Sequence, residues 1–106
     1  MAAKRIPSYA VVWKKDDGLV VPGQLRLEGD GIRLAGAVAG KPEEHALSYR
    51  SLAGVRLGHG PDERLQGQPS MLVELRSLER YVIATIGGFG VLTELADEIT
   101  AAMTLA

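Results

Sequence analysis

The hydrophobic pattern of this chain changes its period once, near residue 87, and this change limits the folds open to it. From residue 9 to residue 86, apolar residues occur in short or alternating runs separated by Gly, Asp and Pro. Such runs are typical of consecutive antiparallel strands. After residue 88 the apolar residues follow helical spacing, at Leu92, Leu95, Ala96, Ile99 and Met103. This spacing predicts an amphipathic helix over 91–104.

The chain is expected to form a single domain, because 106 residues fit one modest hydrophobic core. Residues 1–8 have the composition of a loose N-terminal tail, and 9–106 form the domain. No secretory signal and no apolar run of about 20 residues is present, so the expectation is a cytoplasmic protein. The predicted strands span 9–14, 24–29, 32–38, 45–50, 55–57, 71–76 and 81–86.

The strongest local prediction is a hairpin over 24–38. The pair Asp30-Gly31 favours a two-residue type I′ turn, whose twist matches that of the flanking strands. This turn would place Leu27 opposite Leu34 and Glu28 opposite Arg33. Apolar residues would then face apolar ones, and the acid would face the base.

A second hairpin is predicted to join 71–76 to 81–86 through the turn 77–80. With that turn, Leu72, Tyr81 and Ile83 share one face of the hairpin. We expect these three residues to form an apolar interface patch. Three further candidate contact surfaces are the loop over 14–22, the polar stretch over 58–70, which is expected to be the longest irregular loop, and the exposed edges of strands, which can accept an added strand or pair with a second copy.

The charge balance and the residue types exclude several classes of function. Lys and Arg number 12 against 13 Asp and Glu, giving a net charge of -1 that does not suit a basic nucleic-acid binder. The chain has no Cys, which excludes a disulfide framework, a thiol nucleophile and a zinc finger. One Trp, one Phe and three Tyr provide no aromatic series for stacking bases. No nucleic-acid partner is therefore expected.

No motif for catalysis or for a cofactor is evident. His45 and His59 do not have the spacing of metal-ligating pairs, and no serine occurs in a G-x-S-x-G context. We therefore expect no enzymatic activity, no cofactor and no metal. One alternative is a small metal-binding or hydrolytic protein centred on His59, which lies beside two carboxylates in Gly-His-Gly-Pro-Asp-Glu.

Three passages carry a resemblance to a known family: the hairpin over 25–34, the segment over 47–57 and the terminal helix. Over residues 9–104 the chain resembles the bacterial PH-like and GRAM-like domains of the pleckstrin-homology-like barrel superfamily. The resemblance implies a mainly β (α+β) fold. Its barrel would consist of two near-orthogonal antiparallel sheets, with about seven strands in all, and one C-terminal helix capping an open end.

The resemblance also implies a function. We expect a non-enzymatic binding or adaptor module acting through protein–protein contacts, either with an unknown protein or with a second copy of this chain. In eukaryotic members a basic pattern around the first hairpin binds phosphoinositide head groups. The matching residues are Lys14, Lys15 and Arg26, so the alternative is a weak binder of anionic ligands or membrane surfaces. Gln24 and the pair Asp16-Asp17 depart from the family pattern.

Overall fold

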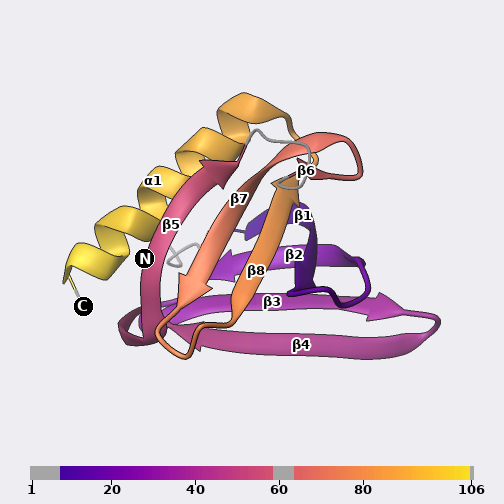
Figure 1. The fold of residues 1–106 in the computed structure, drawn as a ribbon, viewed down its shortest axis with the longest axis horizontal. Coiled ribbons are helices and arrows are strands. Elements are labelled where there is room, and N and C mark those ends of the chain that lie inside the picture. Colours follow the sequence, from indigo (N-terminus) through magenta and orange to yellow (C-terminus); the bar gives the residue numbers. More distant parts are fainter. Residues whose placement is uncertain (1–7, 59–63, 106) are drawn as a thin grey trace, which may run out of the picture.

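A computed structural model describes residues 8–58 and 64–105 (Figure 1). The expected mainly β fold with a C-terminal helix is confirmed: the strands form one antiparallel sheet, and a single α-helix follows them. β1 begins at Ser8, one residue into the predicted tail. The elements are β1 (Ser8–Lys15), β2 (Val21–Leu27), β3 (Gly31–Val38), β4 (Lys41–Ser48), the short 3-10 helix η1 (Tyr49–Ser51), β5 (Leu52–Gly58), β6 (Arg64–Leu65), β7 (Gln68–Leu75), β8 (Arg80–Thr85) and α1 (Phe89–Leu105).

The sheet has β1 at its centre and is open. Its strand order is β4-β3-β2-β1-β8-β7-β5, and β6 pairs with β7 alone. β1 pairs with β2 over Ser8–Trp13 and with β8 over Val11–Lys15, so it belongs to both halves of the sheet. Figure 1 shows β3 and β4 running across the steeper β5, β7 and β8. Within the described residues, β4 and β5 are the two ends of the sheet.

The main core lies between the concave side of the sheet and α1. The helix packs against β5, β7, β8 and η1, which agrees with its predicted apolar stripe. Leu95 and Ile99 on that stripe are completely buried. Trp13 and Leu34 reach the same core from the other half of the sheet. The change of period at the end of β8 thus produces the element that covers the core.

A smaller apolar cluster occupies the opposite face of β7 and β8. Leu65 of β6 packs there with Leu72, Val82 and Ala84, all of them buried. The prediction of an irregular loop over 58–70 was therefore wrong at Gly58, which ends β5, and from residue 64 onward, while 59–63 lie outside the described residues. Gln66 and Gly67 both have positive φ, 54° and 78°, as a two-residue type I′ turn between paired strands requires.

The hairpin between β2 and β3 is present, but its register differs by two residues from the prediction. Leu25 lies opposite Leu34, and Arg26 lies opposite Arg33. Neither Asp30 nor Gly31 has positive φ, so the turn is not of type I′. A longer connection forms instead, because Tyr49 holds it: the Tyr49 N–H donates to the Asp30 carbonyl at 2.9 Å, and the hydroxyl donates to the Glu28 carbonyl at 3.0 Å.

A two-residue turn of the kind predicted at Asp30-Gly31 occurs instead at Ala39-Gly40, between β3 and β4. Ala39 and Gly40 have φ of 51° and 79°, and Val38 pairs with Lys41 across the turn. β4 consequently begins four residues earlier than the predicted strand over 45–50, and Pro42 lies within it. Residues that precede the predicted strand thus form the start of an edge strand.

The loop of the hairpin between β7 and β8 is shorter than predicted. As a result, the side chains of β8 point to the opposite face of the sheet from the one expected. The Leu75 N–H donates to the Glu79 carbonyl at 2.9 Å, leaving a loop from Arg76 to Leu78 in place of the predicted turn over 77–80. Met71 therefore pairs with Ile83, three residues from the predicted register. An odd shift turns every side chain of one strand to the other face.

Candidate functional site

The free edge of the sheet lies along β4, the outermost strand in Figure 1. Val38 and Lys41 flank the two-residue turn, and such a flanking pair is hydrogen-bonded in an antiparallel hairpin. Because hydrogen-bonded pairs alternate along the ladder, every second residue of β4 directs its backbone groups away from β3. These residues are Pro42, Glu44, Ala46 and Ser48.

Pro42 fits this alternation, because its missing N–H would have pointed away from β3. Proline is tolerated at such edge positions. Glu44, Ala46 and Ser48 therefore supply outward N–H groups, and all three residues are exposed. A row of unpaired backbone donors and acceptors is a template onto which another strand can pair.

The inner face of β4 is tied to β8 across the interior of the fold. His45 Nδ1 and the Tyr81 hydroxyl are 2.6 Å apart, and His45 Nε2 lies 3.4 Å from a carboxylate oxygen of Glu43. The His45 ring also meets Trp13 edge-on, with ring centroids 5.0 Å apart. Burial raises the pKa of Tyr81, which keeps this phenol protonated as a hydrogen-bonding group. The cluster therefore holds the edge strand in place.

Lys15 and Glu79 form an ion pair next to this cluster. The hydrogen bond from Lys15 lowers the pKa of Glu79, and the same bond raises the pKa of Lys15. Both side chains remain about two-fifths exposed. In the described part of the chain, no group of His, Asp and Glu side chains is disposed to hold a metal ion.

The three predicted basic residues do not converge. Lys14 and Lys15 are successive strand residues and point to opposite faces, and Lys15 is paired with Glu79. Arg26 lies opposite Ser8, six residues along β1 from Lys14, or about 20 Å away at strand spacing. Glu79, whose carboxylate forms the ion pair with Lys15, lies more than 60 residues further along the chain, and no local sequence signal identifies it as the partner.

The predicted apolar patch of Leu72, Tyr81 and Ile83 is not exposed. Leu72 belongs to the smaller cluster, whereas Tyr81 and Ile83 face the main core. All three are at most 3% exposed. Two causes account for this burial. The shorter loop brings Tyr81 opposite Val73 and turns it into the main core, and Leu72 packs with Leu65 of β6 in the smaller cluster. His59, the residue of the metal-binding alternative, lies outside the described residues.

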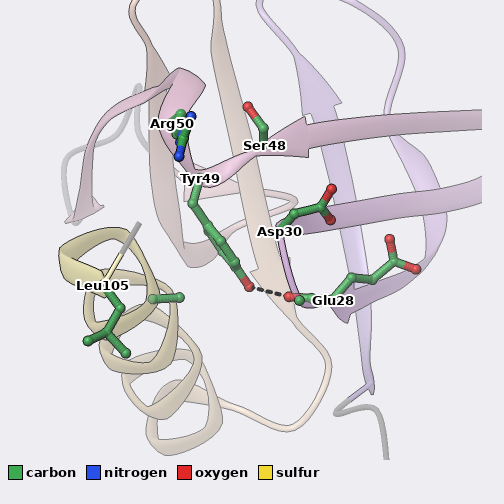
Figure 2. Close-up of a pocket in the computed structure, with 8 residues that line it drawn as sticks. Glu28, Asp30, Ser48, Tyr49, Arg50 and Leu105 are labelled. Carbon is green, nitrogen blue, oxygen red and sulfur yellow. Dashed lines mark hydrogen bonds between the residues drawn. The ribbon is translucent and has the colours of Figure 1, made fainter.

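A hollow of about 560 Å³ lies at the end of β4 (Figure 2). The connection between β2 and β3, η1 and the last turn of α1 surround it. Figure 2 shows Glu28 and Asp30 on one side of Tyr49 and Arg50 on the other, with Leu105 below. Sequence reasoning did not identify this site, because its residues come from three separate segments. Its lining residues are Glu28, Gly29, Asp30, Ser48, Tyr49, Arg50, Ala102 and Leu105.

Comparison with known proteins shows a likeness of fold. A crystal structure titled as the C-terminal domain of an unknown protein from Leishmania infantum matches this chain with a TM-score of 0.66 and 8% sequence identity. The match covers 89% of this chain and 82% of that chain. No protein-family model and no curated protein matches the chain. Within the described residues, no helix is long and apolar enough to cross a membrane.

Proposed function

We propose that this chain is a non-enzymatic binding module of pleckstrin-homology-like architecture that acts through protein–protein contacts. The strand order supports this proposal: four antiparallel strands precede the turn at η1, and β1 joins them to β8, β7 and β5. The crossing of β3 and β4 over the steeper strands is consistent with two near-orthogonal layers. A helix directly after the last strand, packed over the core, completes the expected arrangement.

The observation that carries the binding role is the free edge of β4. The outward backbone groups of Glu44 and Ala46 and the Ser48 N–H can pair with an extended segment of another protein, whereas the Ser48 carbonyl already accepts from the Ser51 hydroxyl at 2.7 Å. His45 on the inner face of this strand also bonds to Tyr81 of β8, which ties the edge strand to the other half of the sheet. A partner strand would thereby extend the sheet without moving the core.

The test is to remove one outward N–H while leaving the pairing of β4 with β3 intact. Ala46→Pro does so. Pro42 also belongs to the set of β4 residues whose backbone groups point away from β3, which shows that a proline is accommodated at such a position. Ala46→Thr is the matched control, because it adds a side chain but keeps the N–H. Each protein is used as bait in its own cell extract, and self-association is followed by sedimentation velocity.

Wild type and Ala46→Thr are expected to capture the same partner or to self-associate to the same extent. Ala46→Pro should weaken that association by about tenfold, the equivalent of losing about 1.4 kcal/mol of strand pairing. Near-ultraviolet circular dichroism establishes that the variant is folded. Association that is equally strong in all three proteins would show that the β4 edge is not the binding surface.

The structure gives the anionic-ligand alternative no comparable support. Lys15 already pairs with Glu79, and Lys14 and Arg26 lie too far apart to hold one head group. An unpaired cluster of cations would be needed to bind an anionic surface firmly.

A further inference from the structure

The free edge of β4 lacks one donor at its first outward residue and one free acceptor at its last. The outward N–H groups belong to Glu44, Ala46 and Ser48. Pro42 has no N–H, but its carbonyl points outward with those of Glu44 and Ala46. The Ser48 carbonyl is already engaged, since it accepts from the Ser51 hydroxyl at 2.7 Å. The donors and the free acceptors are thus equal in number but offset by one outward position.

These two gaps coincide when the strand pairs with an antiparallel copy of itself about His45. In an antiparallel ladder, two residues that face each other through their outward groups exchange both N–H···O bonds. A two-fold axis at His45 places Glu44 opposite Ala46 of the second copy, and Pro42 opposite Ser48 of the second copy. The missing N–H of Pro42 then faces the engaged carbonyl of Ser48. Every outward donor meets a free acceptor.

The neighbouring registers match these groups less well. An axis at Glu44 pairs Ala46 with Pro42 of the second copy and moves Ser48 beyond the start of β4. It also brings two Glu44 carboxylates face to face, which is unfavourable. An axis at Ala46 directs the Glu44 N–H to the engaged carbonyl of Ser48 and leaves the Pro42 carbonyl unused. The register about His45 has neither fault.

The charges on the exposed face of β4 also suit this register. Arg33 of β3 lies opposite Ala46, and its guanidinium binds the Glu44 carboxylate of its own chain at 2.6 Å. Glu44 of the second copy would lie on the far side of Ala46, about 10 Å from Arg33 between Cα atoms. A guanidinium has five N–H donors, and extended Arg and Glu side chains can meet over that distance across a small alanine. Each copy therefore offers a cation to a carboxylate of the other.

The opposite end of the sheet is a poorer partner for β4. The pairing of β5 with β7 shifts between Leu52 and Gly54, and such an irregularity interrupts the alternation of backbone groups. Irregularities of this kind protect sheet edges from added strands. A contact between β4 of one copy and β5 of the next would also continue into a filament, whereas pairing of β4 with β4 closes after two copies.

We propose that this chain forms a two-fold dimer in which β4 pairs with β4 of a second copy about His45. This inference rests on the proposed role of the β4 edge and names its occupant. The two sheets join into one continuous sheet. Because few residues pair on each side, the interface is small, and we expect a dissociation constant of about 10 to 100 µM.

Cysteine pairs can report the register, because the chain has no Cys of its own. Glu44→Cys and Ala46→Cys proteins are mixed in equal amounts and oxidised gently, and mass spectrometry separates the mixed disulfide from the two symmetric ones. In the proposed register these two positions face each other with about 5.5 Å between Cα atoms, which suits a disulfide. Position 46 of one copy lies about 8 Å from position 46 of the other, which is too far.

The mixed disulfide is expected in at least about tenfold excess over either symmetric one, against the roughly twofold excess that random collision gives. Ser77→Cys, at an exposed loop residue far from β4 in sequence, is mixed with Ala46→Cys to measure that background. By sedimentation velocity the wild type should contain monomer and dimer alone, with the dimer fraction rising between about 10 and 100 µM. Circular dichroism establishes that the variants are folded.

An excess of the symmetric Ala46→Cys disulfide would place the axis at Ala46 and overturn the register, and disulfides in the background ratio would overturn the pairing itself. A wild type that stays monomeric up to about 1 mM would also overturn the dimer. If Ala46→Pro then loses capture of a different protein, the β4 edge binds that protein and the proposed function stands. Capture that is unchanged in Ala46→Pro would contradict the proposed function as well.

Discussion

Leu78 is the residue whose backbone fits its side chain least well. Its φ is 75°, a left-handed conformation that favours glycine, and its side chain is 92% exposed. Asp16, which also has positive φ, is a residue type that tolerates this region. Leu78→Gly is therefore expected to increase the free energy of unfolding by about 1 kcal/mol. The substitution relieves the backbone strain, and it removes almost no buried apolar surface because the Leu78 side chain is exposed. Urea unfolding measures the change.

The matched control is Leu78→Ala, which removes the exposed apolar side chain but keeps the Cβ that causes the strain. Its stability should remain within about 0.5 kcal/mol of the wild type. An increase of equal size in both variants would attribute the effect to lost surface hydrophobicity. A Gly variant less stable than the wild type would show that the entropy of the unfolded chain outweighs the strain.

At the scale of elements, the bond between His45 and Tyr81 joins the edge strand β4 to β8. The two groups are 2.6 Å apart and partly buried, so removal of either leaves the other without its partner. Tyr81→Phe should lower the free energy of unfolding by about 1 to 2 kcal/mol. His45→Leu should cost a similar amount, and the double variant should cost less than the sum of the two.

A double-mutant cycle by urea unfolding gives the interaction energy of this pair. We expect a coupling of at least about 0.5 kcal/mol, as found for groups in direct contact. Additive effects would mean that the hydrogen bond contributes nothing beyond the packing of the two rings. Hydrogen exchange at Leu47, whose N–H points toward β3 and pairs with Ile32, should also become faster in these variants if the bond positions β4.

The sequence allowed the types of elements to be predicted, but not the pairing of every hairpin. Alternation and helical spacing are local, which is why the strands and the helix could be located. The Asp30-Gly31 turn failed because Gly31 serves another purpose: a Cβ there would lie 2.1 Å from the Leu47 carbonyl oxygen of β4. A glycine needed for close approach of two strands looks the same in sequence as a glycine needed for a turn.

The candidate sites were harder to predict for a related reason. The β4 edge depends on the turn at Ala39-Gly40, since that turn decides which residues direct their backbone groups outward. The hollow at the end of β4 is lined by both Asp30 and Leu105, which lie 75 positions apart in the chain. The apolar patch around Tyr81 was lost through a loop one residue shorter than expected. Each of these features depends on the long-range geometry of the sheet.

For the whole molecule, the three tyrosines predict how stability changes at alkaline pH. Burial raises the pKa of Tyr9, Tyr49 and Tyr81 above the ordinary value of 10.0, and nearby carboxylates contribute to each increase. Between that value and their native pKa, the folded protein retains protons that the unfolded chain has released. Their stabilising contribution is therefore complete below about pH 10 and is lost as the pH rises through the native pKa values.

The free energy of unfolding should accordingly fall above about pH 10, and ultraviolet absorbance of tyrosinate should appear together with unfolding. Lys15 acts in the same direction, because its raised pKa reflects pairing with Glu79. High salt separates the two contributions: it screens the half-exposed ion pair but does not restore water to a buried phenol. The alkaline loss should therefore persist in high salt and should be smaller in Tyr81→Phe. Tyrosinate absorbance from all three residues near pH 10 in a protein that is still folded would show that burial does not hold these protons.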